Sequence, residues 1–223
     1  MISSNALAVS SSLAAAFDEF VFNISTLLVN FSAYELMGHD TKTGELLWLQ
    51  NQDNTTPEER KPGLGDTHSN TIIYDDGFIY YAAGDGNGGV KLQLADDGKS
   101  IKEIWRNKDF DSYMGGIVKV GNHLYGCGTA KRDFKSINAE TGEIEDIIKA
   151  GSGAVIAADS MLYYYNFGGH VMLITLNPTD MEIVGDFKMK KGAREHFAHP
   201  VINRGRLYIR HGNVIQAYDI SAK

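Results

Sequence analysis

From residue 34 onward, apolar and aromatic residues occur in short runs separated by turns rich in Gly, Asp and Asn. Runs of this length and composition predict β-strands. Four segments share one pattern: a strand, a polar turn, and a second strand in which an apolar residue precedes a tyrosine. These tyrosines are Tyr80, Tyr125, Tyr163 and Tyr208, spaced by 45, 38 and 45 residues. A repeat of this length containing only strand patterns predicts about four strands, the size of a propeller blade.

A second feature recurs in phase with the first. The segment from Asp40 to Trp48 reads DTKTGELLW, and related segments follow the later strand pairs. Asp or Asn accepts hydrogen bonds from its own nearby backbone, and Gly supplies the positive φ of a tight reversal. We expect each segment to lead into the outer strand of a blade, where a Trp packs against the next blade.

These turn segments resemble the repeat signature Ala-x-Asp-x-x-Thr-Gly-x-x-x-Trp of propellers related to the pyrroloquinoline quinone (PQQ) dehydrogenases. The motif residues, in copies that decay along the chain, are Asp40, Thr43, Gly44, Trp48, Gly98, Trp105, Asn138, Thr141, Gly142 and Asp219. The third copy has Asp146 where the Trp belongs. The resemblance covers residues 34–223 and implies an all-β fold, a β-propeller of four-stranded antiparallel blades. It predicts about four to five blades in this chain, either as a whole propeller or as part of a larger one.

The strand count leaves two arrangements open. We expect residues 1–33 to be an irregular or helical lead-in and residues 34–223 to form the propeller repeats. Within the repeats, residues 34–49 predict two outer strands, residues 70–107, 114–149 and 153–188 three blades, and residues 198–220 three inner strands. Either the strand around Glu45–Leu49 completes the last blade and closes a ring of four, or the chain is part of a longer architecture. We favour the second, because an open arc would leave unpaired strand edges.

Composition narrows the function classes. The formal net charge is −7 and the Lys and Arg residues are scattered, so we predict no nucleic-acid partner. The densest basic run, Lys188 to Arg194, is expected to be a solvated loop. No apolar run reaches the 18 residues of a membrane span, so no transmembrane segment is predicted. Cys127 is the single cysteine and is expected to be a small buried packing residue.

Candidate chemistry lies at the start of the innermost strands, which ring one mouth of a propeller channel. Alignment on the four tyrosines places His68 and His196 in one phase, and His199 in a second. Histidine titrates near neutral pH and binds metals, so convergent histidines at a channel mouth are binding candidates. The candidate set is His68, Tyr113, Arg194, His196 and His199. The favoured interpretation is that these histidines hydrogen-bond neighbouring loops, and no metal site is predicted.

The resemblance also implies a possible activity. Quinoprotein dehydrogenases hold PQQ on the channel axis with a calcium ion, and they commonly stack it on a vicinal disulfide and a Trp. A chain with Cys127 alone cannot form that disulfide. We therefore predict a non-catalytic propeller that binds a small molecule or acts as a protein-interaction scaffold. A PQQ- and calcium-dependent dehydrogenase with part of its site outside this chain stays an alternative. A lyase or a glycan-binding propeller that uses the channel-mouth residues is a second alternative.

The compartment is predicted from the resemblance alone. Propellers of this type are usually exported in bacteria, which indicates a periplasmic or outer-membrane-associated protein. The first 20 residues are rich in Ala and Ser but contain no Lys or Arg, so they give no clear signal-peptide pattern.

Overall fold

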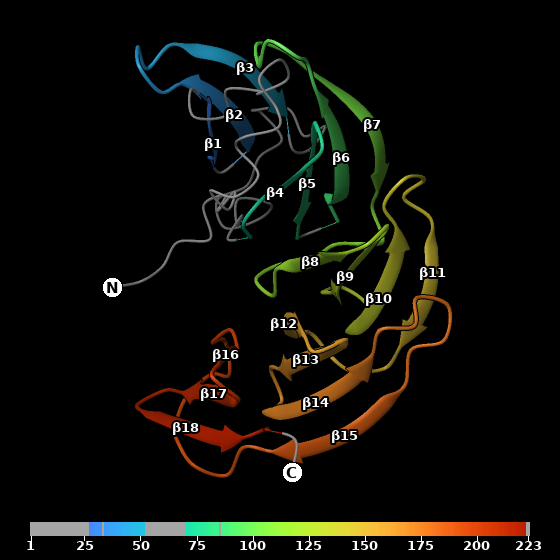
Figure 1. Ribbon diagram of the computed structural model, residues 1–223, viewed down its shortest axis with the longest axis vertical. Coiled ribbons are helices and arrows are strands. Elements are labelled where there is room, and N and C mark those ends of the chain that lie inside the picture. The colour runs from blue at the N-terminus through green and yellow to red at the C-terminus, as the bar shows by residue number, and fades with distance from the viewer. Residues whose placement is uncertain (1–26, 33, 52–69, 85, 222–223) are drawn as a thin grey trace.

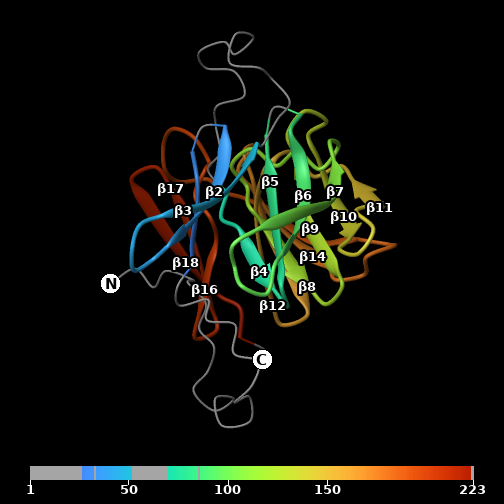
Figure 2. The same cartoon turned by 90° about the horizontal axis from the view of Figure 1, so that it is seen from above.

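The computed structural model describes residues 27–32, 34–51, 70–84 and 86–221. In these residues the chain forms five antiparallel sheets arranged around a common axis (Figure 1). We call the sheets blades 1 to 5 in chain order. Figures 1 and 2 place blades 1 and 5 on one side of the molecule and blades 2 to 4 on the other.

The blades follow one another along the chain, and in each the strands are neighbours in sequence order. Blade 1 contains β1 (Leu27–Phe31), β2 (Glu35–Asp40) and β3 (Leu46–Asn51). Blade 2 contains β4 (Ile73–Asp75), β5 (Phe78–Ala83), β6 (Gly88–Leu94) and β7 (Ile101–Asn107). Blade 3 contains β8 (Ile117–Val120), β9 (His123–Gly128), β10 (Asp133–Asn138) and β11 (Ile144–Ile148). Blade 4 contains β12 (Gly153–Ala158), β13 (Met161–Asn166), β14 (His170–Thr175) and β15 (Ile183–Lys188). Blade 5 contains β16 (Val201–Asn203), β17 (Arg206–His211) and β18 (Val214–Asp219).

The predicted fold class is confirmed: the described chain consists of antiparallel blades of three or four strands, five in number. One expectation needs correction, and one of the two arrangements left open does not form. Residues 27–31 were expected within the lead-in, but their alternating apolar pattern makes them strand β1, which pairs with β2; residues 1–26 lie outside the described residues. Closure of a four-bladed ring by Glu45–Leu49 is also not what forms, because Leu46–Leu49 lie in β3, which pairs with β2 in a separate blade.

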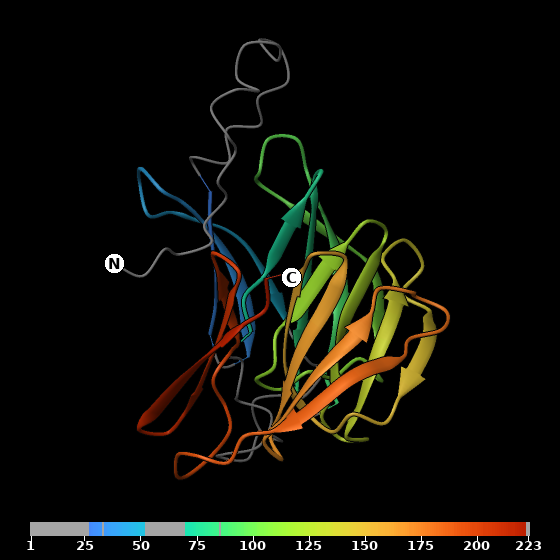
Figure 3. The ribbon, with the colours of Figure 1, turned by 60° about the horizontal axis from the view of Figure 1, so that its bottom comes forward.

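The hydrophobic core lies between successive blades. The apolar residues that precede the four repeat tyrosines are all buried: Ile79, Leu124, Leu162 and Leu207. Each belongs to a cluster that joins one blade to a neighbouring blade. Figure 3 shows the successive sheets side by side, so that one face of each sheet lies against its neighbour. Burying one such side chain contributes about 1.5–3 kcal/mol, so each of these four residues stabilises the contact between its blade and a neighbour.

The turns before the outer strands have the predicted geometry. In blade 1, Asp40 Oδ1 accepts hydrogen bonds from the backbone N–H groups of Lys42 and Thr43, both at 2.8 Å. The N–H of Gly44 donates to the Asp40 carbonyl at 2.8 Å, and Gly44 has a φ of 74°. This left-handed conformation is costly for residues with a Cβ, which explains the glycine.

Blade 3 repeats this turn bond for bond. Asn138 Oδ1 accepts from the N–H groups of Glu140 (2.9 Å) and Thr141 (3.2 Å). The Gly142 N–H donates to the Asn138 carbonyl at 2.8 Å, and Gly142 has a φ of 75°. The turns of blades 2 and 5 keep only part of this pattern. In blade 2 Gly98 has a φ of 70°, and in blade 5 Asp219 Oδ1 accepts a hydrogen bond from the Ser221 N–H.

Both tryptophans connect one blade to the turn of the next. Trp48 Nε1, in blade 1, donates to the Gly98 carbonyl of blade 2 at 3.1 Å. Trp105 Nε1, in blade 2, donates to the Ala139 carbonyl of blade 3 at 3.1 Å. The Trp105 ring also covers Gly142, where a Cβ would lie 2.6 Å from the ring. The turn motif of one blade therefore packs against, and accepts a hydrogen bond from, a Trp in the outer strand of the preceding blade.

The strand register identifies the same position in all four outer strands. Trp48, Trp105, Asp146 and Gly185 each pair with the last residue before a register shift in the adjacent strand. Asp146 retains the connection without an aromatic ring, because its Oδ2 accepts from the Met181 N–H of blade 4 at 2.6 Å. We call these four residues the inter-blade position.

Candidate functional site

The described candidate residues lie in two loops, each of which enters the first strand of a blade: Tyr113 in the loop between β7 and β8, and Arg194, His196 and His199 in the loop between β15 and β16. The loop between β7 and β8 contacts the β9–β10 turn through Tyr113, whose N–H donates to Thr129 Oγ1 at 2.8 Å. The loop between β15 and β16 contacts the β13–β14 turn, because a Cβ on Gly169 would lie 2.7 Å from His196. These contacts define one loop face of the propeller, which we use below as the candidate site.

Tyr113 and His199 join this face from different blades. The Tyr113 ring packs against Gly84, where a Cβ would lie 2.7 Å from the ring. His199 precedes β16, but its Nε2 donates to the carbonyl oxygen of Met114, the residue after Tyr113, at 3.1 Å. His199 Cε1 also lies close to Gly116. The imidazole of His199 therefore ties the segment before blade 5 to the loop before blade 3.

His196 lies between blades 4 and 5. Its Nδ1 is hydrogen-bonded to the Tyr165 hydroxyl, and its ring stacks on His211 with centroids 3.7 Å apart and an interplanar angle of 19°. The pKa of His196 is lowered, first by burial and then by the charges of His211 and Lys188. Burial raises the pKa of Tyr165 to about 12, so this hydroxyl stays protonated and donates to a neutral His196.

His211, which the sequence interpretation missed, holds the loop that contains Arg194. Its Nδ1 lies 2.9 Å from the Lys191 carbonyl oxygen, and its Nε2 lies 2.7 Å from that of Arg194. The His211 ring therefore lies within hydrogen-bonding distance of two carbonyl oxygens of this loop. Alignment on the repeat tyrosines could have found it, because His211 follows Tyr208 by the interval that separates Asn166 from Tyr163. Asn166 also bonds a preceding loop, by donating to the Ala150 carbonyl at 2.8 Å.

The predicted residues thus contribute to one face without forming one cluster. His196 contacts Tyr165 and His211, whereas His199 contacts Met114. The Arg194 carbonyl accepts a hydrogen bond, while its side chain is exposed. His68 lies outside the described residues. Among the residues that are described, no group of three or more His, Cys, Asp or Glu side chains is placed to hold a metal ion.

A buried ionic group below this face was also not predicted. Lys135 and Asp133 are ion-paired on β10, and the Lys135 side chain is fully buried. Asp111 lies near this pair, because a Cβ on Gly128 would approach Lys135, Asp133 and Asp111 together. Burial raises the pKa of Asp111, and its Oδ2 accepts from the Ala130 N–H at 3.1 Å. Buried charges need such partners, so we interpret this group as structural.

The described residues do not fit the PQQ arrangement that the sequence resemblance implies. Both indole rings lie at the inter-blade position, and both indole N–H groups donate to the next blade. Cys127 is buried, as predicted, with its Sγ 3.5 Å from Ser112 Oγ. Neither indole is therefore placed as a stacking surface on the channel axis.

The repeated turns, the inter-blade contacts and the five blades define a β-propeller of the PQQ-like class. The sequence model described as outer membrane protein assembly factor BamB matches residues 3–145. The chain belongs to this BamB family. No curated protein matches the sequence, and no helix long and apolar enough to cross a membrane occurs in the described part of the chain.

Solved structures share the fold at low sequence identity. BamB from Moraxella catarrhalis has a TM-score of 0.62 and 14% identity, with 86% of this chain and 54% of that chain covered. A protein named as a 6-phosphogluconolactonase from Bacteroides uniformis has a TM-score of 0.61 and 16% identity, with 86% and 65% covered. The computationally designed Ika8 protein has a TM-score of 0.57 and 9% identity, with 87% and 56% covered. The chain thus spans between 54% and 65% of the length of these structures.

Proposed function

We propose that this chain is a non-catalytic propeller that presents its loop face to a protein partner. The observation that carries the proposal is how the candidate side chains are used. His196 bonds Tyr165 and His199 bonds the Met114 carbonyl, so two side chains that could serve in catalysis hold loops of different blades in place. A fixed set of loops on a rigid scaffold suits recognition, because little conformational entropy is lost on binding.

Family membership supports the same proposal. BamB is described as an outer membrane protein assembly factor, and this description favours a function through contacts with proteins. By extension, we propose a periplasmic or outer-membrane-associated location for this chain. Similarity of fold alone does not decide the function of this chain, because a protein named as a lactonase matches it about as well as BamB does.

The experiment compares binding with catalysis on the same purified chain. One arm titrates PQQ with Ca²⁺ by calorimetry and follows dye reduction with a panel of alcohols and sugars. The other arm screens a phage-displayed random peptide library for peptides that bind the folded protein. We expect peptide binders and no quinone-dependent dye reduction. Tight PQQ binding with alcohol-dependent dye reduction would overturn the proposal and favour the dehydrogenase. Glycan binding, or cleavage of a glycan by elimination, that His196→Ala abolishes with the melting temperature unchanged would favour the lyase or glycan-binding alternative.

A further inference from the structure

Four cations are concentrated at the end of β15 and in the loop that follows it. Lys188, Lys190, Lys191 and Arg194 are all exposed and lie within seven residues of a chain whose formal net charge is −7. A local excess of positive charge on an otherwise acidic protein attracts acidic ligands and accelerates their association. A solvated loop explains the exposure of these side chains, but it does not explain how firmly the backbone is held.

The backbone of this loop is anchored at several points. Met189 is buried and its N–H donates to the Gly169 carbonyl at 2.9 Å. His211 bonds the carbonyl oxygens of Lys191 and Arg194, as described above. Gly192, with a φ of 107°, passes so close that a Cβ there would lie 2.4 Å from the His211 carbonyl oxygen. The cations are therefore carried on a preorganised loop, which lowers the entropic cost of binding a ligand.

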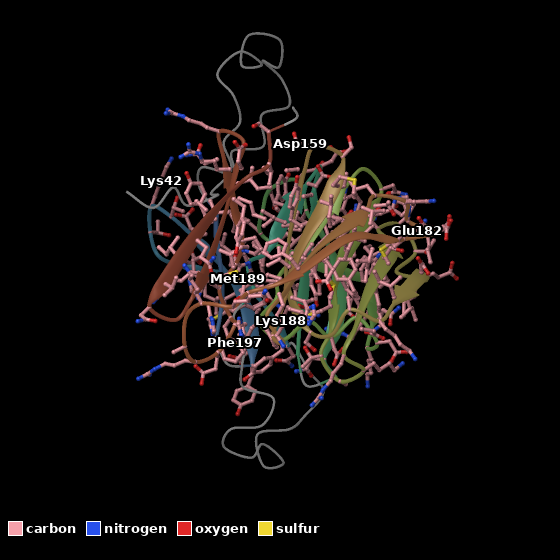
Figure 4. The ribbon with its side chains drawn as sticks, turned by 90° about the horizontal axis from the view of Figure 1, so that it is seen from below. Lys42, Asp159, Glu182, Lys188, Met189 and Phe197 are labelled. Carbon is pink, nitrogen blue, oxygen red and sulfur yellow. The ribbon has the colours of Figure 1, made fainter. Side chains whose placement is uncertain are left out.

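An aromatic pair, made of the exposed Phe197 and the half-buried Phe167, lies beside the cations. Phe197 is 47% exposed and meets Phe167, from the β13–β14 turn, edge to face with ring centroids 4.9 Å apart. Met189 bonds Gly169 in the same β13–β14 turn that contains Phe167, so the start of the basic loop lies close to the aromatic pair. Figure 4 shows Lys188 and Phe197 on the same side of the molecule, near the buried Met189.

We propose that Phe167, Phe197, Lys188, Lys190, Lys191 and Arg194 form a docking surface for an acidic peptide segment that carries an aromatic or large apolar anchor. This inference rests on the proposed protein-binding function and specifies the partner. Aromatic rings and cations side by side bind an anchor residue and its flanking carboxylates together. The surface also contains two acidic residues, fewer than its four cations, so its net charge is positive. Asp186 is tied to His170 at 3.0 Å, and Glu195 lies within the loop.

The test uses three synthetic twelve-residue peptides and fluorescence anisotropy. The first is rich in Asp and Glu with a central Phe, the second has Ala in place of that Phe, and the third has Lys in place of the acids. We expect the first to bind with an affinity that falls steeply between about 50 and 300 mM salt, because the charges are exposed and screened. The second should bind about tenfold more weakly, and the third should not bind.

Variants locate the surface. The triple change Lys188→Ala, Lys190→Ala and Lys191→Ala should weaken binding of the acidic peptide about tenfold and flatten its salt dependence. Phe197→Ala should reduce the affinity of the Phe peptide to that of the Ala peptide. Lys42→Ala, at an exposed lysine in the turn of blade 1, should leave binding within about twofold.

The outcomes separate the two proposals. Equal binding of the acidic and basic peptides, or an unchanged affinity in the triple variant, would overturn the docking surface. If the acidic peptide fails but library-selected peptides of other composition bind, the scaffold function stands and this surface is wrong. If no peptide binds and PQQ does, both proposals are wrong.

Discussion

Replacing Trp48 by alanine tests whether an outer strand is held by the turn of the next blade. The Trp48 side chain is 7% exposed, and its indole N–H donates to the Gly98 carbonyl at 3.1 Å. Truncating a buried Trp to Ala costs about 3–5 kcal/mol. Trp48→Phe keeps much of the ring packing and loses the hydrogen bond to a partly exposed carbonyl, which costs about 0.5–1.5 kcal/mol. For a chain of this size we expect the melting temperature to fall by about 10 °C for Ala and about 4 °C for Phe.

The assay combines thermal unfolding, followed by circular dichroism, with amide hydrogen exchange. Leu49→Ala is the matched control, because Leu49 is the next residue of β3 and is 45% exposed; its expected change is below about 1 kcal/mol. In Trp48→Ala, the amides of the blade 2 turn, among them Gly98 and Lys99, should exchange faster, while those of the Asn138–Gly142 turn should not. A loss below about 1 kcal/mol for Trp48→Ala, or a uniform rise in exchange across all turns, would refute the inter-blade role.

Three further predictions use the same stability assays. Gly142→Ala should destabilise the fold by several kcal/mol more than Gly44→Ala: both glycines have a positive φ, but only at Gly142 does the added Cβ meet the Trp105 ring, so equal losses would contradict the docking. The unfolded chain protonates His196 near pH 6.5 and the folded protein only at lower pH, so stability should fall as the pH drops below 6.5, and His196→Gln should flatten that slope; an identical pH profile would contradict this. Gly185→Trp should raise the melting temperature by a few degrees, because the inter-blade position is open there and a Cβ meets only Leu173, at 3.5 Å; a lower melting temperature would show that the site cannot accept the ring.

The repeat pattern predicted the fold because each blade depends on local signals. The spacing of the tyrosines locates the second strands, and the Asp-x-x-Thr-Gly turn locates the outer strands, since its hydrogen bonds lie within a few residues. Strand β1 escaped prediction because the five residues Leu27–Phe31 follow a segment of different composition, and a pattern this short was read as part of that segment. Local pattern therefore identifies strands well inside the repeat and less well at its margin.

The candidate face was harder to predict, because its contacts join residues far apart in sequence. His199 bonds a carbonyl 85 residues away, and the Tyr165–His196 contact spans 31 residues. Phase alignment indicated that these histidines lie on one face, but it could not show that each meets a different blade. The path of the loop depends on Gly192 and Arg194 in positive-φ conformations, and no periodic pattern specifies such conformations.

The inter-blade position suggests how such a propeller tolerates loss of its own signature. The residue at this position is Trp in blades 1 and 2, Asp in blade 3 and Gly in blade 4. The register shift beside it is present in all four blades. Asp146 replaces the indole donor with a carboxylate acceptor for the Met181 N–H, so the polar connection survives with its direction reversed. Blade 4 has no side chain at Gly185, and an aromatic contact two residues away joins it to blade 5: Phe187 packs against Tyr218 with ring centroids 4.7 Å apart. Since dispersion and burial between sheets are distributed over many atoms, the fold can lose the Trp of any one copy as long as the backbone register and the neighbouring apolar contacts remain.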